Sequence, residues 1–232
     1  MTRINGFLGR RQLLRIAGGT ILMSVCGASV YQPAIAEPKL EIISPDEALE
    51  RLLDGNKRFT QQKSQHPHQS KTRLEEVAQA QHPFATILSC ADSRVSGEIL
   101  FDQGMGDLFD IRIAGNIVTP EALGSIEYAA VELSCTLIMV LGHERCGAVT
   151  AAVKGEPLPG VMGTFVKGIK PAIADIKGFS KETVEKAVVE NVKYQVQKMK
   201  DSSQLLSQLV DASKLKIVGG RYDLDTGKVT IV

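Results

Sequence analysis

The sequence predicts an α/β fold with a mostly parallel central sheet, about four parallel strands plus an antiparallel C-terminal edge strand, covered by helices. Three observations support this prediction. Several apolar runs are continuous, which is typical of parallel strands buried on both faces. The runs alternate along the chain with stretches of helical periodicity. The last apolar segments flank a turn-forming stretch, residues 225–228, which predicts a closing hairpin.

The first predicted element is a helix that begins at Pro45. Ser44 can cap this helix, and Pro45 suits its first turn. Two acidic residues follow at the positive end of the helix dipole, and apolar residues then recur near helical spacing. A polar loop over residues 61–70 and a short helix over residues 71–81 come next.

Four apolar runs predict the parallel strands, at residues 84–88, 108–113, 136–141 and 215–218. Helical patterns fill the intervals at residues 120–133, 145–154 and 180–210. A hairpin of residues 222–224 and 229–232 would add the antiparallel edge strand.

The N-terminus has the features of an export signal. Arg10-Arg11 precedes a moderately apolar stretch over residues 16–30, and residues 34–36 (Ala-Ile-Ala) form a small-x-small pattern. The arginine pair indicates the twin-arginine route, although Gly9 stands where Ser or Thr is usual.

We therefore expect residues 1–36 to be a signal peptide and residues 37–232 to be one exported domain. The mature protein would be periplasmic, or lumenal if the source has thylakoids, with no stable membrane insertion. An uncleaved membrane anchor and lipidation at Cys26 are the alternatives. The apolar run is short for a membrane span of ~20 residues, and Val25 is larger than lipidation sites usually allow.

Charge and cysteine content narrow the function classes. The chain carries 27 Lys and Arg against 26 Asp and Glu, a formal net charge of +1, so no strong field favours nucleic acid or an anionic membrane. Without the signal, three cysteines remain, Cys90, Cys135 and Cys146. An odd number argues against a disulfide framework in an exported domain.

Unusual residues follow two of the predicted strands, where sites form in such folds. His143 and Cys146 follow the third strand three residues apart, so both side chains can point the same way. Cys90 follows the first strand and would supply a third ligand. Three protein ligands plus water are the pattern of a catalytic zinc site. Cys135 precedes the third strand, so it should lie at the opposite edge of the sheet.

Asp92 and Arg94 follow Cys90 at intervals of two residues, so their side chains can lie on one side of the turn. Arginine can hold a carboxylate bidentately, and a carboxylate held in this way stays ionised. Asp92 could then accept a hydrogen bond from zinc-bound hydroxide, or ligate the zinc and close the site if Arg94 released it. A Cys90–Cys146 disulfide, or two small buried apolar residues, are the alternatives for the thiols.

The segments 90–94 (Cys-Ala-Asp-Ser-Arg) and 143–147 (His-Glu-Arg-Cys-Gly) together resemble the signature pair of the β-class carbonic anhydrases. The similarity extends across roughly residues 45–232. It implies one zinc per subunit bound by Cys90, His143 and Cys146, with Asp92 and Arg94 as a catalytic dyad. The implied reaction is the reversible hydration of carbon dioxide to bicarbonate and a proton by zinc-bound hydroxide.

The resemblance also implies how substrate binds. Gln81 would donate a hydrogen bond to bicarbonate, Phe109 and Tyr128 would line a narrow apolar cleft, and Gly147 matches the glycine after the second cysteine. Members of the family are dimers or higher homo-oligomers, with the cleft at a subunit boundary.

Two features depart from the family pattern. Asp110 and Ile113 stand where an apolar residue and Asn are common, and could alter the cleft wall. The chain has no Trp, so the Trp-containing second bicarbonate pocket of some members cannot be assembled. We therefore expect the open state, with water as fourth ligand at neutral pH. No proton shuttle is identifiable from the sequence.

Two other functions stay open at this point. Hydrolysis of carbonyl sulfide or carbon disulfide could use the same fold and zinc site. An exported zinc-binding or redox dithiol protein could use Cys90 and Cys146. The Asp92–Arg94 pair favours an enzyme, because a zinc store has little need for it.

Overall fold

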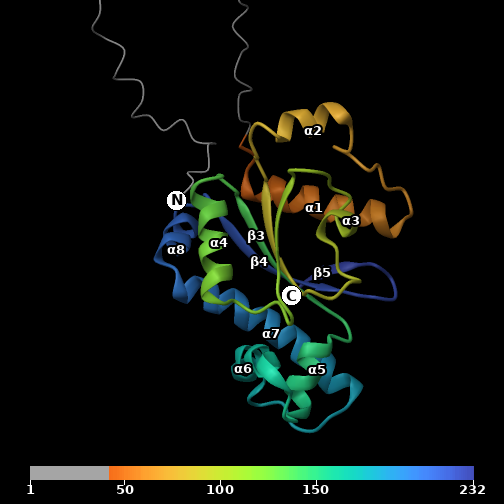
Figure 1. Ribbon diagram of the computed structural model, residues 1–232, viewed down its shortest axis with the longest axis vertical. Coiled ribbons are helices and arrows are strands. Elements are labelled where there is room, and N and C mark those ends of the chain that lie inside the picture. The colour runs from red at the N-terminus through yellow and green to blue at the C-terminus, as the bar shows by residue number, and fades with distance from the viewer. Residues whose placement is uncertain (1–41) are drawn as a thin grey trace, which may run out of the picture. The chain divides into compact units, whose positions relative to one another are not determined.

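The central sheet has five strands in the order β2-β1-β3-β4-β5, as a computed structural model that describes residues 42–232 shows (Figure 1). The strands are β1 Ala85–Ser89, β2 Leu108–Arg112, β3 Leu137–His143, β4 Lys216–Tyr222 and β5 Val229–Ile231. β1 pairs in parallel with β2 and β3, β3 pairs in parallel with β4, and β5 runs antiparallel to β4. The predicted fold class is confirmed. The predicted signal peptide, residues 1–36, lies outside the described residues.

Helices cover both faces of this sheet (Figure 1). The described helices are α1 Pro45–Thr60, α2 Lys71–Val77, α3 Gly97–Leu100, α4 Pro120–Val131, α5 Gly147–Lys154, α6 Gly163–Ile169, α7 Lys181–Ser202 and α8 Gln204–Asp211, with 3-10 turns at Gly160–Met162 and Lys170–Ile173. One apolar cluster joins α1 and α3 to the sheet, and a second joins α4, α7 and α8 to the opposite face. Within residues 42–232, none of the helices has the length and apolar character needed to cross a membrane.

The apolar run of β3 is continuous because both faces of this strand are buried. Leu137, Met139 and Leu141 pack into the cluster with α1, whereas Ile138 and Val140 pack into the cluster with α7. Successive side chains of a strand point to opposite faces, so a strand covered on both sides must be apolar at every position.

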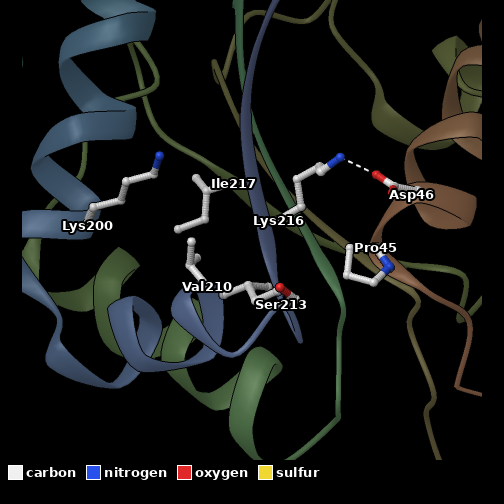
Figure 2. A pocket seen from close by; sticks show the side chains of 8 residues that line it. Pro45, Asp46, Lys200, Val210, Ser213, Lys216 and Ile217 are labelled. Atoms are coloured by element: carbon white, nitrogen blue, oxygen red, sulfur yellow. Dashed lines mark hydrogen bonds and ion pairs between the residues drawn. The ribbon is translucent and has the colours of Figure 1, made fainter.

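α1 begins where the sequence predicts. Ser44 and Glu47 form a reciprocal capping box, and Pro45 occupies the first turn. Lys216 of β4 forms an ion pair with Asp46 beside a pocket of about 370 Å³ (Figure 2). This pocket lies at the amino-terminal end of β4, and so at the opposite end of the sheet from the predicted metal ligands.

Of the helix boundaries that differ from prediction, three have a clear local cause. The pattern over residues 180–210 is two helices, because Ser203 is extended and its hydroxyl accepts the Leu206 N–H to cap α8. α2 ends at Val77 rather than at residue 81, since none of its residues is buried to stabilise a longer helix. α5 begins at Gly147 rather than at residue 145, because Arg145 has a positive φ of 52° and cannot be part of the helix.

The fourth predicted strand, residues 215–218, is longer in the structure. β4 continues through Gly219 and Gly220 to Tyr222, the first residue of the predicted hairpin, whereas Asp223 and Leu224 lie outside the strand. A side chain at Gly219 would meet Val192 of α7, with the added Cβ only 2.6 Å from a methyl carbon. Glycine here permits close packing of α7 on the sheet.

Candidate metal centre

The three predicted metal ligands meet at the carboxyl ends of two neighbouring strands. Cys90 directly follows β1, and His143 is the last residue of β3, which pairs in parallel with β1. Cys146 lies just beyond β3. The ligand atoms of Cys90, His143 and Cys146 all lie within 4.8 Å of one another, and all three residues are buried.

The donor set fits a zinc ion. Two zinc–thiolate bonds at a tetrahedral angle place the sulfurs about 3.8 Å apart, and the Sγ atoms of Cys90 and Cys146 are 3.9 Å apart. His143 Nδ1 lies 2.9 Å from the Glu144 carbonyl oxygen, so Nδ1 must carry the proton that it donates. Nε2 then carries a lone pair, and this buried atom has no hydrogen-bond partner among the described residues.

Negative charge is favoured on Cys90, whereas the hydrogen bond that the Cys146 thiol donates to Cys90, together with burial, raises the pKa of Cys146. The Gly115 N–H donates to Cys90 Sγ at 3.3 Å. The hydrogen bond from the Cys146 thiol, reinforced by His143 and Gly115, lowers the pKa of Cys90. Cys146 occupies the N-cap position of α5, where a thiolate faces the positive end of the helix dipole.

Asp92 and Arg94 form the predicted bidentate pair. Arg94 Nε donates to Asp92 Oδ1 at 2.9 Å, and Nη2 donates to Oδ2 at 2.7 Å. This pairing, together with the Arg94 backbone N–H, holds the pKa of Asp92 far below its usual range. Asp92 Oδ2 lies 3.9 Å from His143 Nε2, so the ionised carboxylate borders the ligand cluster.

The structure does not bring the predicted cleft residues to the metal ligands of the same chain. Phe109 of β2 pairs with Thr86, four strand residues or about 13 Å before Cys90. The Tyr128 ring is near Phe109, with ring centroids 6.4 Å apart, and Gln81 is exposed on the amino-terminal side of β1. All three therefore lie toward the amino-terminal ends of the strands, whereas the metal ligands lie at the carboxyl-terminal ends.

Cys135 and Gly147 are two further residues that the sequence analysis singles out. Cys135 is buried before β3, away from the ligand cluster as predicted, and its thiol donates to the Pro83 carbonyl. A Cβ built on Gly147 meets no atom within 4 Å among the described residues, so the space beside Gly147 is open within this chain.

Asp110, one of the departures from the family pattern, lies under α3. A Cβ built on Gly97 would be 2.7 Å from both carboxylate oxygens of Asp110, so the carboxyl packs against the first residue of the helix. Its Oδ1 is buried without a hydrogen-bond partner among the described residues. Burial and the nearby Glu98 carboxylate raise the pKa of Asp110 to about 7. Ile113, the other departure, packs among apolar side chains.

Replacing Asp110 by Asn should change how stability depends on pH. A carboxyl with a raised pKa stabilises the fold at low pH, and this contribution is lost as pH rises through about 7. We compare the unfolding free energy of Asp110→Asn with that of wild type at pH 5 and at pH 8. The difference, variant minus wild type, should be about 1–2 kcal/mol more positive at pH 8 than at pH 5. Urea unfolding at both pH values measures this gain. The exposed Asp54→Asn should show no gain, and equal pH profiles for Asp110→Asn and wild type would contradict the prediction.

Sequence reasoning did not identify Gly115 as a donor to Cys90. Gly115 has a positive φ of 75°, and its carbonyl accepts a hydrogen bond from the fully buried Asn191 of α7 at 2.9 Å. In the sequence, Gly115 simply follows the second predicted apolar run, residues 108–113. A glycine at that point is the one signal in the sequence that could have indicated a special backbone conformation.

Comparisons with known proteins show which family the chain resembles. A family model described as carbonic anhydrase matches residues 85–229. The carbonic anhydrase of Mycolicibacterium smegmatis is 38% identical over 192 residues, which is 81% of this chain and 93% of that protein. The Coccomyxa β-carbonic anhydrase, solved in complex with acetazolamide, has 28% identity and a TM-score of 0.64 over 79% of this chain and 86% of that one. A tetrameric β-carbonic anhydrase of Sordaria macrospora has 24% identity and a TM-score of 0.65 over 80% of this chain and 97% of that one.

Proposed function

The chain belongs to the β-carbonic anhydrases, enzymes that hydrate carbon dioxide with zinc, and we propose that Cys90, His143 and Cys146 are its zinc ligands. The observation that carries this assignment is the ligand cluster itself, two thiols and an unpartnered imidazole Nε2 within 4.8 Å of one another. When bound, zinc would activate a water molecule for attack on carbon dioxide.

Asp92 and Arg94 act together on the reacting water in this proposal. Arg94 holds the carboxylate ionised and in a fixed orientation, with Oδ2 toward His143. Asp92 accepts a hydrogen bond from the attacking water and so directs its lone pair toward the carbon of the substrate. The bidentate pair supports the open state, in which Asp92 is held away from the metal.

The substrate cleft would be completed by another copy of the chain. Three predicted cleft residues lie toward the amino-terminal ends of the strands: Gln81, Phe109 and Tyr128. The proposed zinc ligands lie at the carboxyl-terminal ends. In a homodimer or larger homo-oligomer, the three cleft residues of one subunit line the cleft of the next. The tetrameric assembly of the Sordaria macrospora enzymes supports this arrangement. A monomeric mass in sedimentation equilibrium, with full activity, would rule it out.

A hydration assay on the mature chain tests the proposed site directly. We expect rapid carbon dioxide hydration by stopped-flow pH-indicator measurement, with activity removed by a chelator and restored by zinc. Carbonyl sulfide serves as the rival substrate and should be turned over more slowly. Hydration that persists after all zinc has been removed would overturn the metal assignment.

We further propose export by the twin-arginine route, with residues 1–36 removed and residues 37–232 acting outside the cytoplasm. The support is the order of Arg10-Arg11, an apolar stretch and Ala-Ile-Ala at residues 34–36. Replacing both arginines by lysine should trap the precursor in the cytoplasm, as fractionation and immunoblotting would detect. Export that survives both this change and loss of the twin-arginine translocase would contradict the route.

A further inference from the structure

Arg112, the last residue of the edge strand β2, bridges the loop that carries two of the proposed site residues. Its Nε donates to the Cys90 carbonyl oxygen at 3.2 Å, and its Nη2 donates to the Asp92 carbonyl oxygen at 2.5 Å. The register of β2 on β1 pairs Arg112 with Ser89, the residue just before this loop. One guanidinium therefore joins the backbone carbonyl of Cys90, a proposed metal ligand, to the backbone carbonyl of Asp92.

The other hydrogen bonds of residues 91–94 stay within the loop, because Arg94 donates from its backbone N–H and its side chain to the Asp92 carboxylate. Ala91 at its centre is exposed, so apolar packing does not fix it. The Val95 N–H donates to the Asp92 carbonyl at 3.0 Å and holds only the far end of the loop. A guanidinium presents several N–H donors in a rigid plane, and so fixes the separation of two acceptors in a way that a single ammonium cannot.

We propose that Arg112 is a positioning residue, which sets the distance between the Cys90 thiolate and the Asp92 carboxylate by clamping their backbone carbonyls. The inference rests on the proposed roles of Cys90 and Asp92. Arg112 is itself exposed and touches neither the metal ligands' donor atoms nor the dyad carboxylate. Its effect on the reaction would pass entirely through the loop backbone.

Arg112→Met and Arg112→Lys test this role. Methionine retains much of the side chain's length and removes both hydrogen bonds, whereas lysine can satisfy one carbonyl but cannot bridge two. We expect Arg112→Met to lower kcat and to speed zinc release to a chelator, each about 10-fold, since residues that support ligands typically contribute 10- to 100-fold. Arg112→Lys should be intermediate in both measurements.

The control is Lys198→Met, which also removes a cationic side chain that donates to a backbone carbonyl, that of Val118 at 2.7 Å. Lys198→Met should leave zinc release and kcat at wild-type values. Because Arg112 is exposed, the melting temperature of Arg112→Met without metal should stay close to that of wild type. A large drop in melting temperature that accounts for the faster zinc release would show a merely structural role and overturn the proposal.

Hydrogen exchange on the metal-free protein separates this inference from the proposed function. The amides of residues 91–95 should exchange faster in Arg112→Met than in wild type, and at the wild-type rate in Lys198→Met. Unchanged exchange would overturn the clamp even if the enzyme is fully active with zinc. Faster exchange in a chain that binds no zinc would instead overturn the proposed function and leave Arg112 as a clamp of the loop alone.

Discussion

Serine in place of Cys90 should leave the purified enzyme nearly free of zinc and unable to hydrate carbon dioxide. A serine hydroxyl stays protonated at neutral pH and is a poor zinc ligand, whereas Cys90 is already favoured as a thiolate by its neighbours. His143→Ala and Cys146→Ser remove the other two proposed ligands and should have the same effect. Metal analysis by mass spectrometry and stopped-flow hydration would measure both losses.

Cys135→Ser is the matched control for the cysteine variants. Cys135 is buried like the others, but burial raises its pKa to about 11, so it remains a neutral thiol. A serine hydroxyl can replace its hydrogen bond to the Pro83 carbonyl. Zinc content and activity should therefore match wild type. Full zinc and activity in Cys90→Ser, or their loss in Cys135→Ser, would show that the ligand assignment is wrong.

Removing the Arg94 side chain should suppress activity while zinc stays bound. Without its two hydrogen bonds, the Asp92 carboxylate is free to move, and Oδ2 starts 3.9 Å from His143 Nε2. It can then compete with water for the metal. We expect Arg94→Ala to lose about 10- to 100-fold in kcat with unchanged zinc content, in the range of other residues that orient ligands.

Two variants make this prediction specific. Asp92→Asn should also lose most activity, because an amide oxygen does not orient the attacking water as a carboxylate does. Arg58→Ala breaks an ion pair with Asp102 elsewhere in the fold and should keep wild-type kcat. A wild-type crystal structure near pH 7 with Asp92 directly on zinc would refute the open state, and would indicate an enzyme that opens as pH rises.

Local sequence patterns were sufficient for most of the fold. The strands were predictable because a sheet covered on both faces demands uninterrupted apolar runs, as in β3. Ser203 shows the limit of such patterns. Apolar periodicity continues from α7 into α8, but α7 ends because Ser203 is extended and caps α8. The hydrogen bond that the Ser203 hydroxyl donates to Glu127 of α4 stabilises this conformation.

The proposed site was predictable for a related reason. Cys90 and His143 each follow an apolar run, and parallel strands that are neighbours end at the same edge, so the sequence indicated that they meet. Arg112, Gly115 and Asn191 were missed because their roles depend on backbone atoms of distant segments. The spacing of residues in the sequence does not indicate that Arg112 of β2 donates to the Cys90 carbonyl. It also does not indicate that Asn191 of α7 donates to the Gly115 carbonyl.

The meeting of Cys90 and His143 at the ends of β1 and β3 links metal affinity to folding. Neither segment alone presents the donor set, so at the proposed site the unfolded chain would bind zinc far more weakly than the folded sheet would. Mass action then makes the unfolding free energy rise with free zinc, by about 2.7 kcal/mol when zinc is at 100 times its dissociation constant. With the proposed ligands, the resistance of this enzyme to heat would therefore depend in part on the concentration of free zinc around it.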